Sequence, residues 1–595
     1  MGAQPGDCGD EGSFSLQNHV DANMTTEQCT EAIANHFSHI SQEYPPLNIA
    51  SLPDHVQTKL KQPINPSEMP QITEGDVYEK IRTSKKPKSA VPGDIPKTLI
   101  NECSPDLSIP VCQIFQNILK TFEWPKQWRV EYGVPLQKVS NPINEDQLRI
   151  ISLTSFFSKL FESFVIDWLM EFVGDKIDWG QYGGLKGNSI SHYLIEFTNF
   201  ILYNQDMKNP RAVLAMMIDF SKAFNRQNHN KLIQILSDLE VPSWLLKIVM
   251  AFLTDRELIL RYKGKSSGRK SLPGGSPQGT RLGMFLFLIL INFAGFESFE
   301  LERNIGSVIT QPLADRKPIV NSHMKYIDDL SYVHSMDLKK CLKLKTDGNL
   351  PRPVSYHDRT GHYLPERESV VQKQVDKLNI FISEMDMKIN QEKSKVMIFN
   401  TSRTYDFMPK ISIDGVNHLE VVEEMKLLGI VFQSNMKWFA NTSKLCQNGY
   451  GRLWMLRNLK KYGACISDLI DIYIKQCRCV LELAAPVWTP GLTEAESKQL
   501  ERVQKSAFSI ILGRKYTSYS QALAELKMES LKDRRLNLCT SFAIKSQKHE
   551  KFQNWFEFSD QSTPTTTTFQ PVTYRTKRYR NSPLPYLTNL LNGAY

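Results

Sequence analysis

The sequence predicts an α+β protein, in which short apolar strands are followed by a long helical region. An unbroken apolar run at 212–218, with charged residues on both sides, is typical of a buried strand. Two mostly apolar stretches, 324–327 and 330–333, flank a pair of adjacent aspartates and predict a β-hairpin. After residue 437, apolar residues recur at helical spacing over several long stretches. At about 150 residues per domain, 595 residues predict three or four domains.

Composition excludes several classes of protein. The 41% hydrophobic and 23% charged content is that of a globular chain. The longest apolar run, 284–296, falls short of the roughly 20 residues that cross a bilayer, and we interpret it as core. The N-terminus lacks the basic and apolar regions of a signal peptide. We therefore expect an intracellular protein, in the nucleus or cytoplasm, with no membrane partner.

Cysteine usage and charge point to an intracellular chain with a polyanionic partner. The ten cysteines form no C-x-x-C pairs, which favours a reducing compartment and no structural metal. The formal net charge is +9, but residues 1–60 hold eight acidic side chains and Lys59 as the one base. The rest of the chain therefore carries a net charge of +16, which favours a partner such as a nucleic acid.

Four regions are expected along the chain. Residues 1–73 form a polar, proline-punctuated lead-in at the periphery, with one amphipathic helix at 26–37. Residues 74–436 hold the predicted strands and a polar surface insert at 337–367. Residues 437–558 form a separate helical module, and 559–595 form a basic tail without a packed core.

Three aspartates are the strongest candidates for chemistry. Asp219 follows the predicted buried strand, and Asp328 and Asp329 occupy the tip of the predicted hairpin. Each has a simpler interpretation, since Asp219 could cap the following helix and aspartates are common in turns. If the fold brings Asp219 beside the pair, the three carboxylates offer oxygen ligands for two divalent cations. Two Mg²⁺ ions so held can activate an attacking hydroxyl and stabilise a leaving pyrophosphate.

These motifs resemble those of reverse transcriptases. Tyr326-Ile327-Asp328-Asp329 is similar to the Y/F-x-D-D motif, and Asp219 followed by Phe224 is similar to D-x-x-x-x-F/Y. The resemblance runs in chain order over 85–513 and is closest to the polymerases of non-LTR retrotransposons. It implies a right-hand polymerase fold, with fingers and an antiparallel palm sheet in 74–436, a helical thumb after 437 and a C-terminal helical extension.

The resemblance also implies a set of nucleotide-binding residues. Lys138 and Arg149 match basic positions that contact the triphosphate, and Gln278 and Gly279 match the P-Q-G loop that positions template and nucleotide. Phe224 matches an aromatic gate that excludes ribonucleotides by contact with the sugar. The alternatives are surface charges for the two bases, a simple turn for the glycine loop and a core position for Phe224.

Further positions of the family's pattern are present, and the sequence departs from that pattern at Asn225. Lys393 matches a candidate general acid for the pyrophosphate, although a solvated loop lysine is an alternative. Gln181-Tyr182-Gly183 matches the Q-F/Y-G element, and Leu427-Leu428-Gly429 matches the primer-grip hairpin. Asn225 stands where the family usually has aspartate, at a position that is not an expected metal ligand.

Long helical stretches of the C-terminal module carry basic and aromatic residues. Arg457, Lys460 and Lys461 would share one helix face, which suits a template and primer duplex but equally suits a solvated surface. Trp454 and Trp488 could stack on bases, yet a tryptophan in an apolar helix is more often core.

The implied function is RNA-directed DNA polymerase activity that copies retrotransposon RNA by two-metal nucleotidyl transfer. Its cofactor would be Mg²⁺, as two ions, with Mn²⁺ as a substitute, and its partners an RNA template, a DNA primer and deoxynucleoside triphosphates. The oligomeric state is not indicated. One alternative is a truncated, inactive remnant that only binds nucleic acid, since fewer than about 80 residues precede the fingers motifs and no nuclease domain is expected. A two-metal phosphohydrolase would explain the aspartates but not Gln278 or Phe224.

Overall fold

The chain forms two compact units, described from a computed structural model. The structure describes residues 14–84, 91–294, 305–336, 343–345, 352–354, 370–400, 411–415, 417–559 and 568–593. Unit 1 consists of Met1–Asp178, Phe220–Ala294 and Ile380–Ile389, and unit 2 of Trp179–Asp219, Gly295–Asn379 and Asn390–Tyr595. Helix α15 (Val370–Glu384) crosses the division. Each unit therefore draws on segments that are far apart in the sequence.

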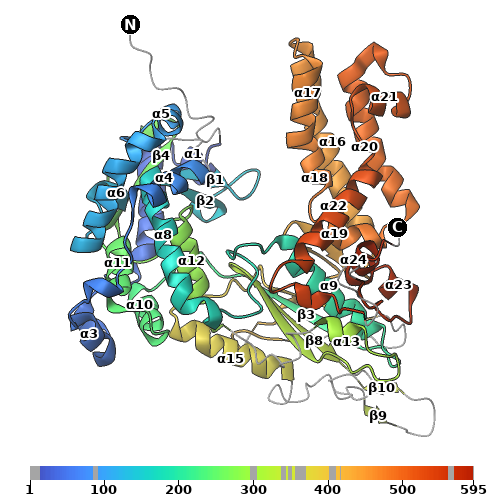
Figure 1. Cartoon of the computed structure of the whole chain (residues 1–595), viewed down its shortest axis with the longest axis horizontal. Helices are drawn as coiled ribbons and strands as arrows, with labels where there is room; N and C mark the ends of the chain where they lie inside the picture. The colour runs from blue at the N-terminus through green and yellow to red at the C-terminus, as the bar shows by residue number, and fades with distance from the viewer. Residues whose placement is uncertain are drawn as a thin grey trace. The chain divides into compact units, whose positions relative to one another are not determined.

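Unit 1 is built on a small sheet with helices packed against it (Figure 1). Its helices are α1 (Gln17–Asp21), α2 (Thr26–Gln42), α3 (Asp54–Lys61), α4 (Glu74–Thr83), α5 (Lys97–Glu102), α6 (Ser104–Thr121), α7 (Lys126–Arg129), α8 (Phe156–Val173), α10 (His229–Asp238), α11 (Ser243–Leu253) and α12 (Arg281–Leu290). Its strands are β1 (Val130–Gln137), β2 (Leu148–Leu153), β4 (Arg256–Tyr262), β5 (Lys265–Ser266) and β6 (Lys270–Leu272). Strand β1 pairs antiparallel with β2 and parallel with β4.

The N-terminal segment belongs to the core of this unit. The predicted amphipathic helix at 26–37 is confirmed as α2, which begins with a capping box between Thr25 and Gln28. Its apolar stripe, including Ile33 and Phe37, packs against Ile150 of β2 and the neighbouring strand β4. The expectation of a peripheral lead-in is therefore wrong for residues 14–73, because a polar segment with one apolar stripe buries that stripe against a sheet face.

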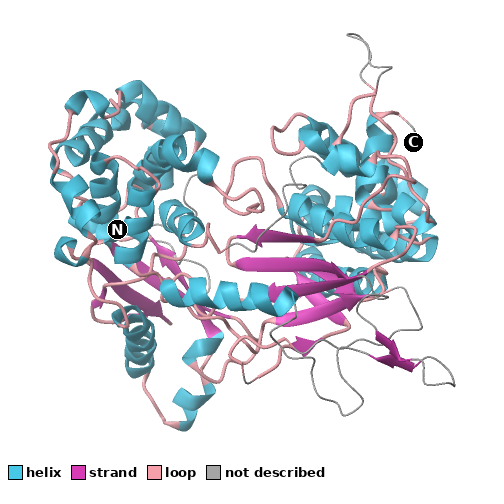
Figure 2. Ribbon diagram, turned by 90° about the horizontal axis from the view of Figure 1, so that it is seen from below, coloured by secondary structure: helices cyan, strands magenta, loops and turns pink. Residues whose placement is uncertain are grey.

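Unit 2 contains a five-stranded sheet and the C-terminal helices (Figure 2). Its strands are β3 (Ala212–Ile218), β7 (Asn321–Tyr326), β8 (Asp329–Met336), β9 (Lys343–Lys345), β10 (Arg352–Val354), β11 (Lys395–Phe399), β12 (Glu420–Val421), β13 (Glu424–Leu427) and β14 (Ile430–Gln433). Its helices are α9 (Ile190–Gln205), α13 (Ile305–Ile309), α16 (Phe439–Lys461), α17 (Ile466–Ile472), α18 (Cys479–Leu481), α19 (Ala485–Trp488), α20 (Glu494–Leu512), α21 (Tyr519–Glu525), α22 (Leu531–Gln547), α23 (Lys577–Arg580) and α24 (Pro583–Leu591).

The central sheet has the strand order β12-β11-β3-β8-β7. The predicted strand at 212–218 is β3, and every one of its residues is buried because it lies between β11 and β8. The pairs β11–β3, β3–β8 and β8–β7 are antiparallel, whereas β12 pairs with β11 in parallel. Helix α9, which is apolar on most of its surface, packs on this sheet and is almost completely buried. Both predicted strand regions are therefore confirmed.

The C-terminal helices share one hydrophobic core with this sheet. Phe197 of α9 and Phe399 of β11 lie in the same buried cluster as Leu445 of α16, Leu500 of α20 and Leu531 of α22. The prediction of helices after residue 437 is confirmed, but the prediction of a separate module is wrong. The reason is that the apolar stripes of these helices bury themselves against sheet elements rather than only against one another.

The end of the chain is also packed against the core. The expectation of a tail without a packed core is therefore wrong for residues 568–593. Tyr579 of α23 and Leu584 of α24 are fully buried in the same core. A buried ion pair anchors this segment, since Arg316 Nη1 lies 2.8 Å from Asp206 Oδ2 and both side chains are at most 1% exposed. The Asp206 carboxylate also accepts hydrogen bonds from the backbone amides of Arg575 and Thr576.

Two other expectations concern the surface of the molecule. The predicted insert at 337–367 lies outside the described residues apart from β9 and β10. Within the described ranges, no helix combines the length and the apolar composition that a bilayer crossing requires.

We predict that Asp206→Ala lowers the free energy of unfolding by about 3 kcal/mol, because it leaves the buried Arg316 guanidinium without its carboxylate. Urea unfolding followed by circular dichroism would measure the change. Asp471→Ala is the matched control, since Asp471 is an exposed partner in an i,i+4 ion pair. Equal unfolding midpoints for Asp206→Ala and the parent protein would contradict this role of the pair.

Candidate functional site

The predicted aspartates lie at one end of the unit 2 sheet. In the antiparallel pair of β3 and β8, Ile218 faces Leu330 as the last paired position. The next residues in this register are Asp219, which follows β3, and Asp329, which begins β8. Asp328 precedes Asp329 in the turn between β7 and β8, where Tyr326 pairs with Asp329. The fold therefore brings the ends of all three strands together, as the sequence predicted for the hairpin.

The hairpin turn is held by a neighbouring segment. Ile327 has a φ of 60°, a left-handed conformation that costs a β-branched residue of the order of 1–3 kcal/mol. The Ile327 amide donates a hydrogen bond to Gln181 Oε1 at 3.4 Å. A Cβ on Gly183 would lie 2.5 Å from the Ile327 nitrogen, so only glycine allows this approach. The Gln181-Tyr182-Gly183 element thus supports the turn that presents Asp328.

Lys393 lies beside the first aspartate. Its Nζ is 3.8 Å from Asp219 Oδ2, and its side chain is 59% exposed. Residues on either side of Lys393 in the sequence also bind the backbone of Asp219. The Asp219 amide donates to Ser394 Oγ at 3.1 Å, and Asp219 O accepts from the Asn390 amide at 2.7 Å. The structure therefore places Lys393 beside Asp219.

The aspartates do not form a ready-made ligand cluster. Among the described residues, no three histidine, cysteine, aspartate or glutamate side chains are arranged so that they could hold a metal ion together. Like-charged carboxylates repel one another, and here the Asp219 carboxylate pairs with Lys393. The available donors are carboxylate oxygens, which are the ligands that Mg²⁺ prefers, so the chemistry of this strand edge fits a hard divalent cation.

The two predicted triphosphate contacts lie on the β1–β2 hairpin of unit 1. Arg149 pairs with Leu136, and the Lys138 amide continues the ladder by donating to Gln147 O at 2.8 Å. Lys138 lies two residues after Leu136 and therefore on the same face, and Arg149 is directly opposite Leu136. Lys138 and Arg149 therefore lie on the same exposed face of the hairpin. Lys138 Nζ bends back to donate to Asp146 O at 3.0 Å.

Phe224 and the Gln278 loop are adjacent parts of unit 1. The carbonyl of Phe224 accepts a hydrogen bond from the Ser276 amide at 2.8 Å, and Gln278 O accepts one from the Ser152 amide of β2 at 2.7 Å. The Phe224 ring is partly buried, 5.3 Å from the ring of Phe287 in α12. Gly279 has a φ of 133°, and a Cβ there would lie 2.8 Å from Ser152 O. The loop is therefore fixed at its backbone by β2 and by the segment that carries Phe224.

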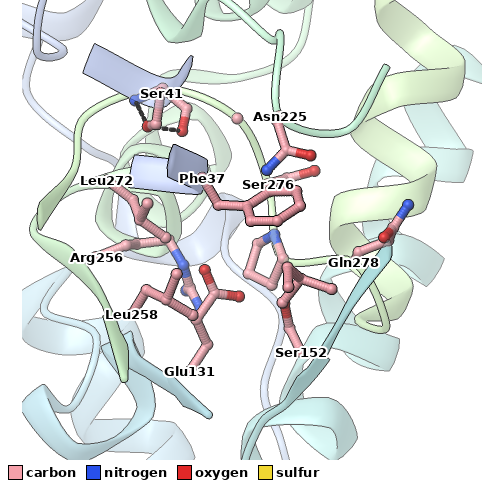
Figure 3. Close-up of a pocket in the computed structure, with 14 residues that line it drawn as sticks. Phe37, Ser41, Glu131, Ser152, Asn225, Arg256, Leu258, Leu272, Ser276 and Gln278 are labelled. Carbon is pink, nitrogen blue, oxygen red and sulfur yellow. Dashed lines mark hydrogen bonds between the residues drawn. The ribbon is translucent and has the colours of Figure 1, made fainter. Parts of the chain in front are cut away.

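A small pocket opens beside this loop (Figure 3). Gln278 and Asn225 lie on one side of it, and the buried side chains of Glu131 and Arg256 point toward one another on another side. Burial raises the pKa of the Glu131 carboxyl group, against the opposing effect of the Arg256 charge. Burial likewise lowers the pKa of Arg256. A buried carboxyl group and a buried guanidinium group thus line the same pocket as Gln278.

Sequence reasoning missed one residue that fixes this loop. Glu162 of α8 is fully buried, and its Oε2 accepts hydrogen bonds from the amides of Arg281 and Leu282 in the first turn of α12, at 3.0 and 3.2 Å. A carboxylate at a helix N-terminus is favourable because it satisfies otherwise unpaired amides. The signal in the sequence was a glutamate among the apolar residues of this helix, and its partners are more than one hundred residues away.

The primer-grip expectation matches a described hairpin. Strands β13 and β14 pair antiparallel, with Leu427 opposite Ile430 and a two-residue turn at Leu428 and Gly429. Both turn residues have positive φ, as tight hairpins require.

Comparison with known proteins identifies the central part of the chain. Residues 137–432 match the family model described as reverse transcriptase (RNA-dependent DNA polymerase). These residues form a reverse transcriptase domain. All the candidate residues, from Lys138 to Lys393, lie within it. The expected α+β right-hand polymerase fold is thereby confirmed for this domain.

Two curated relatives are polymerases of mobile elements. The chain is 23% identical over 496 residues to a probable RNA-directed DNA polymerase from transposon BS of Drosophila melanogaster, an alignment that covers 81% of this chain and 47% of the relative. It is 27% identical over 273 residues to the RNA-directed DNA polymerase from mobile element jockey of Drosophila melanogaster, with 44% and 29% covered. The predicted resemblance to non-LTR retrotransposon polymerases is confirmed.

The extent of these similarities differs. The chain spans about half the length of the transposon BS polymerase and less of the jockey polymerase. Among solved structures, an apo telomerase from Candida tropicalis, truncated from its C-terminal domain, is 10% identical over 52% of this chain and 54% of that chain. Its TM-score is 0.31, so the assignment of the reverse transcriptase domain rests on the family match.

We predict that unit 1 loses stability in acid through His229. Burial lowers the pKa of this histidine from 6.5 to about 4, and its Nε2 donates to Gly275 O at 2.6 Å in the neutral form. Below pH 6.5 the unfolded chain binds a proton that the folded chain does not, so the free energy of unfolding should fall by up to about 3 kcal/mol as the pH falls toward 4.

Urea unfolding at a series of pH values would measure this slope. His229→Asn keeps a side-chain donor but does not titrate, so its slope over the same range should be shallower. His55→Asn, at an exposed position, serves as the control. Parallel slopes for His229→Asn and the parent protein would contradict the assignment.

Proposed function

We propose that this protein is an RNA-directed DNA polymerase that copies the RNA of a non-LTR retrotransposon, extending a DNA primer with deoxynucleoside triphosphates. The observation that carries the proposal is the β3–β8 register, which aligns the ends of strands bearing Asp219 and Asp329 beside the Asp328 turn within a reverse transcriptase domain. A phosphohydrolase would not require the ordered loop at Gln278 or the aromatic side chain at Phe224.

Asp219, Asp328 and Asp329 would hold the catalytic metal, since they are the carboxylates at this edge of the sheet. Two Mg²⁺ ions, or Mn²⁺ in their place, would supply activation of the primer hydroxyl and stabilisation of the leaving pyrophosphate. The chain's own residues orient these ligands, with Ser394 fixing the backbone of Asp219. Lys393, beside Asp219, carries an exposed ammonium group that can donate a proton or a hydrogen bond to the pyrophosphate.

The unit 1 residues would bind the incoming nucleotide. Lys138 and Arg149 share an exposed face of one hairpin, where two cations can neutralise a triphosphate, and Arg149 can bind phosphate in a bidentate manner. Phe224 rests on Phe287, which limits the movement of its ring and suits a steric gate against a ribose 2′-hydroxyl. The backbone of Gln278 is held by β2 and can position a base pair.

The C-terminal helices would hold the template and primer duplex. Residues 437–558 contain 20 lysines and arginines against 11 aspartates and glutamates, which favours binding to a phosphate backbone. Trp454 is 59% exposed on α16, so its interpretation as core is wrong, whereas Trp488 is fully buried as expected. Trp454, Arg457 and Lys461 follow at helical spacing on an exposed face of α16. Lys460 instead donates to Ile510 O and Ile511 O at the end of α20.

We predict that Asp328→Asn abolishes primer extension, with a loss of at least about a thousandfold, because an amide is a poor ligand for a hard cation. The measurement is Mg²⁺-dependent extension of a DNA primer on an RNA template, alongside binding of the same duplex, which should be unchanged or stronger. Asp315→Asn, an exposed aspartate of unit 2, is the matched control. Duplex binding without extension by the parent protein would instead identify an inactive remnant.

We also predict that Phe224→Val relaxes sugar selection, because a smaller side chain leaves room for a 2′-hydroxyl. The ratio of kcat/KM for deoxynucleotide over ribonucleotide should fall by about 10- to 100-fold. Single-nucleotide incorporation measures this ratio, and Phe172→Val, at a partly exposed position of α8, is the control. An unchanged ratio would favour a purely structural role for Phe224.

A further inference from the structure

Lys551 lies outside the reverse transcriptase domain but contacts the segment beside the aspartate hairpin. It follows α22 in the sequence, and its Nζ donates hydrogen bonds to Gln181 O at 2.9 Å and to Trp179 O. The same ammonium group lies 3.8 Å from the centre of the Tyr182 ring, a cation–π contact. The Lys551 side chain thus contacts Trp179, Gln181 and Tyr182 in the 179–182 segment.

This segment is joined to β7 as a short additional strand. The Tyr182 amide donates to Lys325 O, and the Lys325 amide donates to Gly180 O, both at 2.8 Å. Gln181 and Lys325 form a parallel bridge. The segment therefore extends the sheet at the edge strand β7, directly before the turn that carries Asp328.

The turn depends on this added strand. Ile327 is held in the left-handed region, and the Gln181 side chain accepts its amide hydrogen. This hydrogen bond opposes relaxation of the strained Ile327 backbone, and its loss would allow the turn to relax. The position of the Asp328 and Asp329 carboxylates is thus coupled to the position of Gln181.

Two neighbours of Lys551 contact the same region. His549 Nε2 donates to Lys186 O at 3.3 Å, and a Cβ on Gly187 would lie 2.4 Å from that nitrogen. The ring of Phe552, fully buried, stacks on His192 of α9 with ring centres 3.8 Å apart. Residues 549–552 therefore form a continuous contact along the segment that begins at Trp179.

We infer that Lys551 is a positioning residue for the Asp328–Asp329 hairpin, acting through the Gln181-Tyr182-Gly183 strand. Its ammonium group fixes the carbonyls of this strand, and the strand in turn fixes the Ile327 turn. The catalytic consequence rests on the proposed polymerase function, whereas the structural coupling does not. The C-terminal helical region would then be required for the geometry of the site as well as for duplex binding.

The test compares three variants of the full chain. Lys551→Met removes the donor but keeps the length of the side chain, Lys551→Arg restores a donor, and Lys548→Met is the control at an exposed position three residues away. Hydrogen–deuterium exchange reports on the amides of Tyr182, Lys325 and Ile327 without nucleic acid or metal. Primer extension gives kcat, KM and the Mg²⁺ concentration for half-maximal rate.

For Lys551→Met, we expect exchange at these three amides to rise and kcat to fall, each by about tenfold, with KM for nucleotide nearly unchanged. The Mg²⁺ requirement should rise. Lys551→Arg should recover most of both effects, and Lys548→Met should behave as the parent protein.

Two outcomes would overturn the inference. Local exchange of Lys551→Met equal to that of Lys548→Met would mean that the contact does not hold the hairpin. A uniform rise in exchange across unit 2, with a matching fall in Tm, would mean a general structural role. If the parent protein does not extend primers, the proposed function fails, but the exchange comparison still decides the coupling.

Discussion

The antiparallel pairing of β3 with β8 is the constraint on which the candidate site depends. Strand β3 is apolar throughout and buried, so its polar neighbour Asp219 cannot enter the sheet interior without a large desolvation penalty. Asp219 therefore marks where the strand must end. Asp329 marks the start of β8 for the same reason, and the register then places both residues at one edge. A shift of a single residue would reverse the faces of β8, which is buried along most of its length.

Segments from distant parts of the chain complete unit 2. The side chains of Asp206 and Arg316 form a buried ion pair, and the Asp206 carboxylate also accepts hydrogen bonds from the backbone amides of Arg575 and Thr576. Tyr579 is buried in the core that contains α9. A charge pair at this depth is stabilised by partners for its other polar atoms, and here Thr573 Oγ1 accepts a hydrogen bond from Arg316 Nη2. The end of the chain thus supplies polar groups that a buried ion pair needs.

Several features were predictable because their signals are local. The apolar run of β3, the paired aspartates of the hairpin and the helix α2 are each marked by consecutive residues, and all three are found. The packing of the two terminal segments was not predictable. The burial of apolar residues such as Phe37 and Leu584 depends on surfaces made by other parts of the chain.

By itself, the sequence determined the strand with Asp219, the hairpin with Asp328 and Asp329, and the order of the motifs, since periodicity and turn chemistry act over a few residues. Only the tertiary structure decided what holds those motifs. Glu162 reaches the first turn of α12, and Lys551 reaches the carbonyl of Gln181, across long separations in the chain. Such contacts leave no pattern in the sequence, because a hydrogen bond between distant residues needs only that folding brings a donor and an acceptor within about 3 Å.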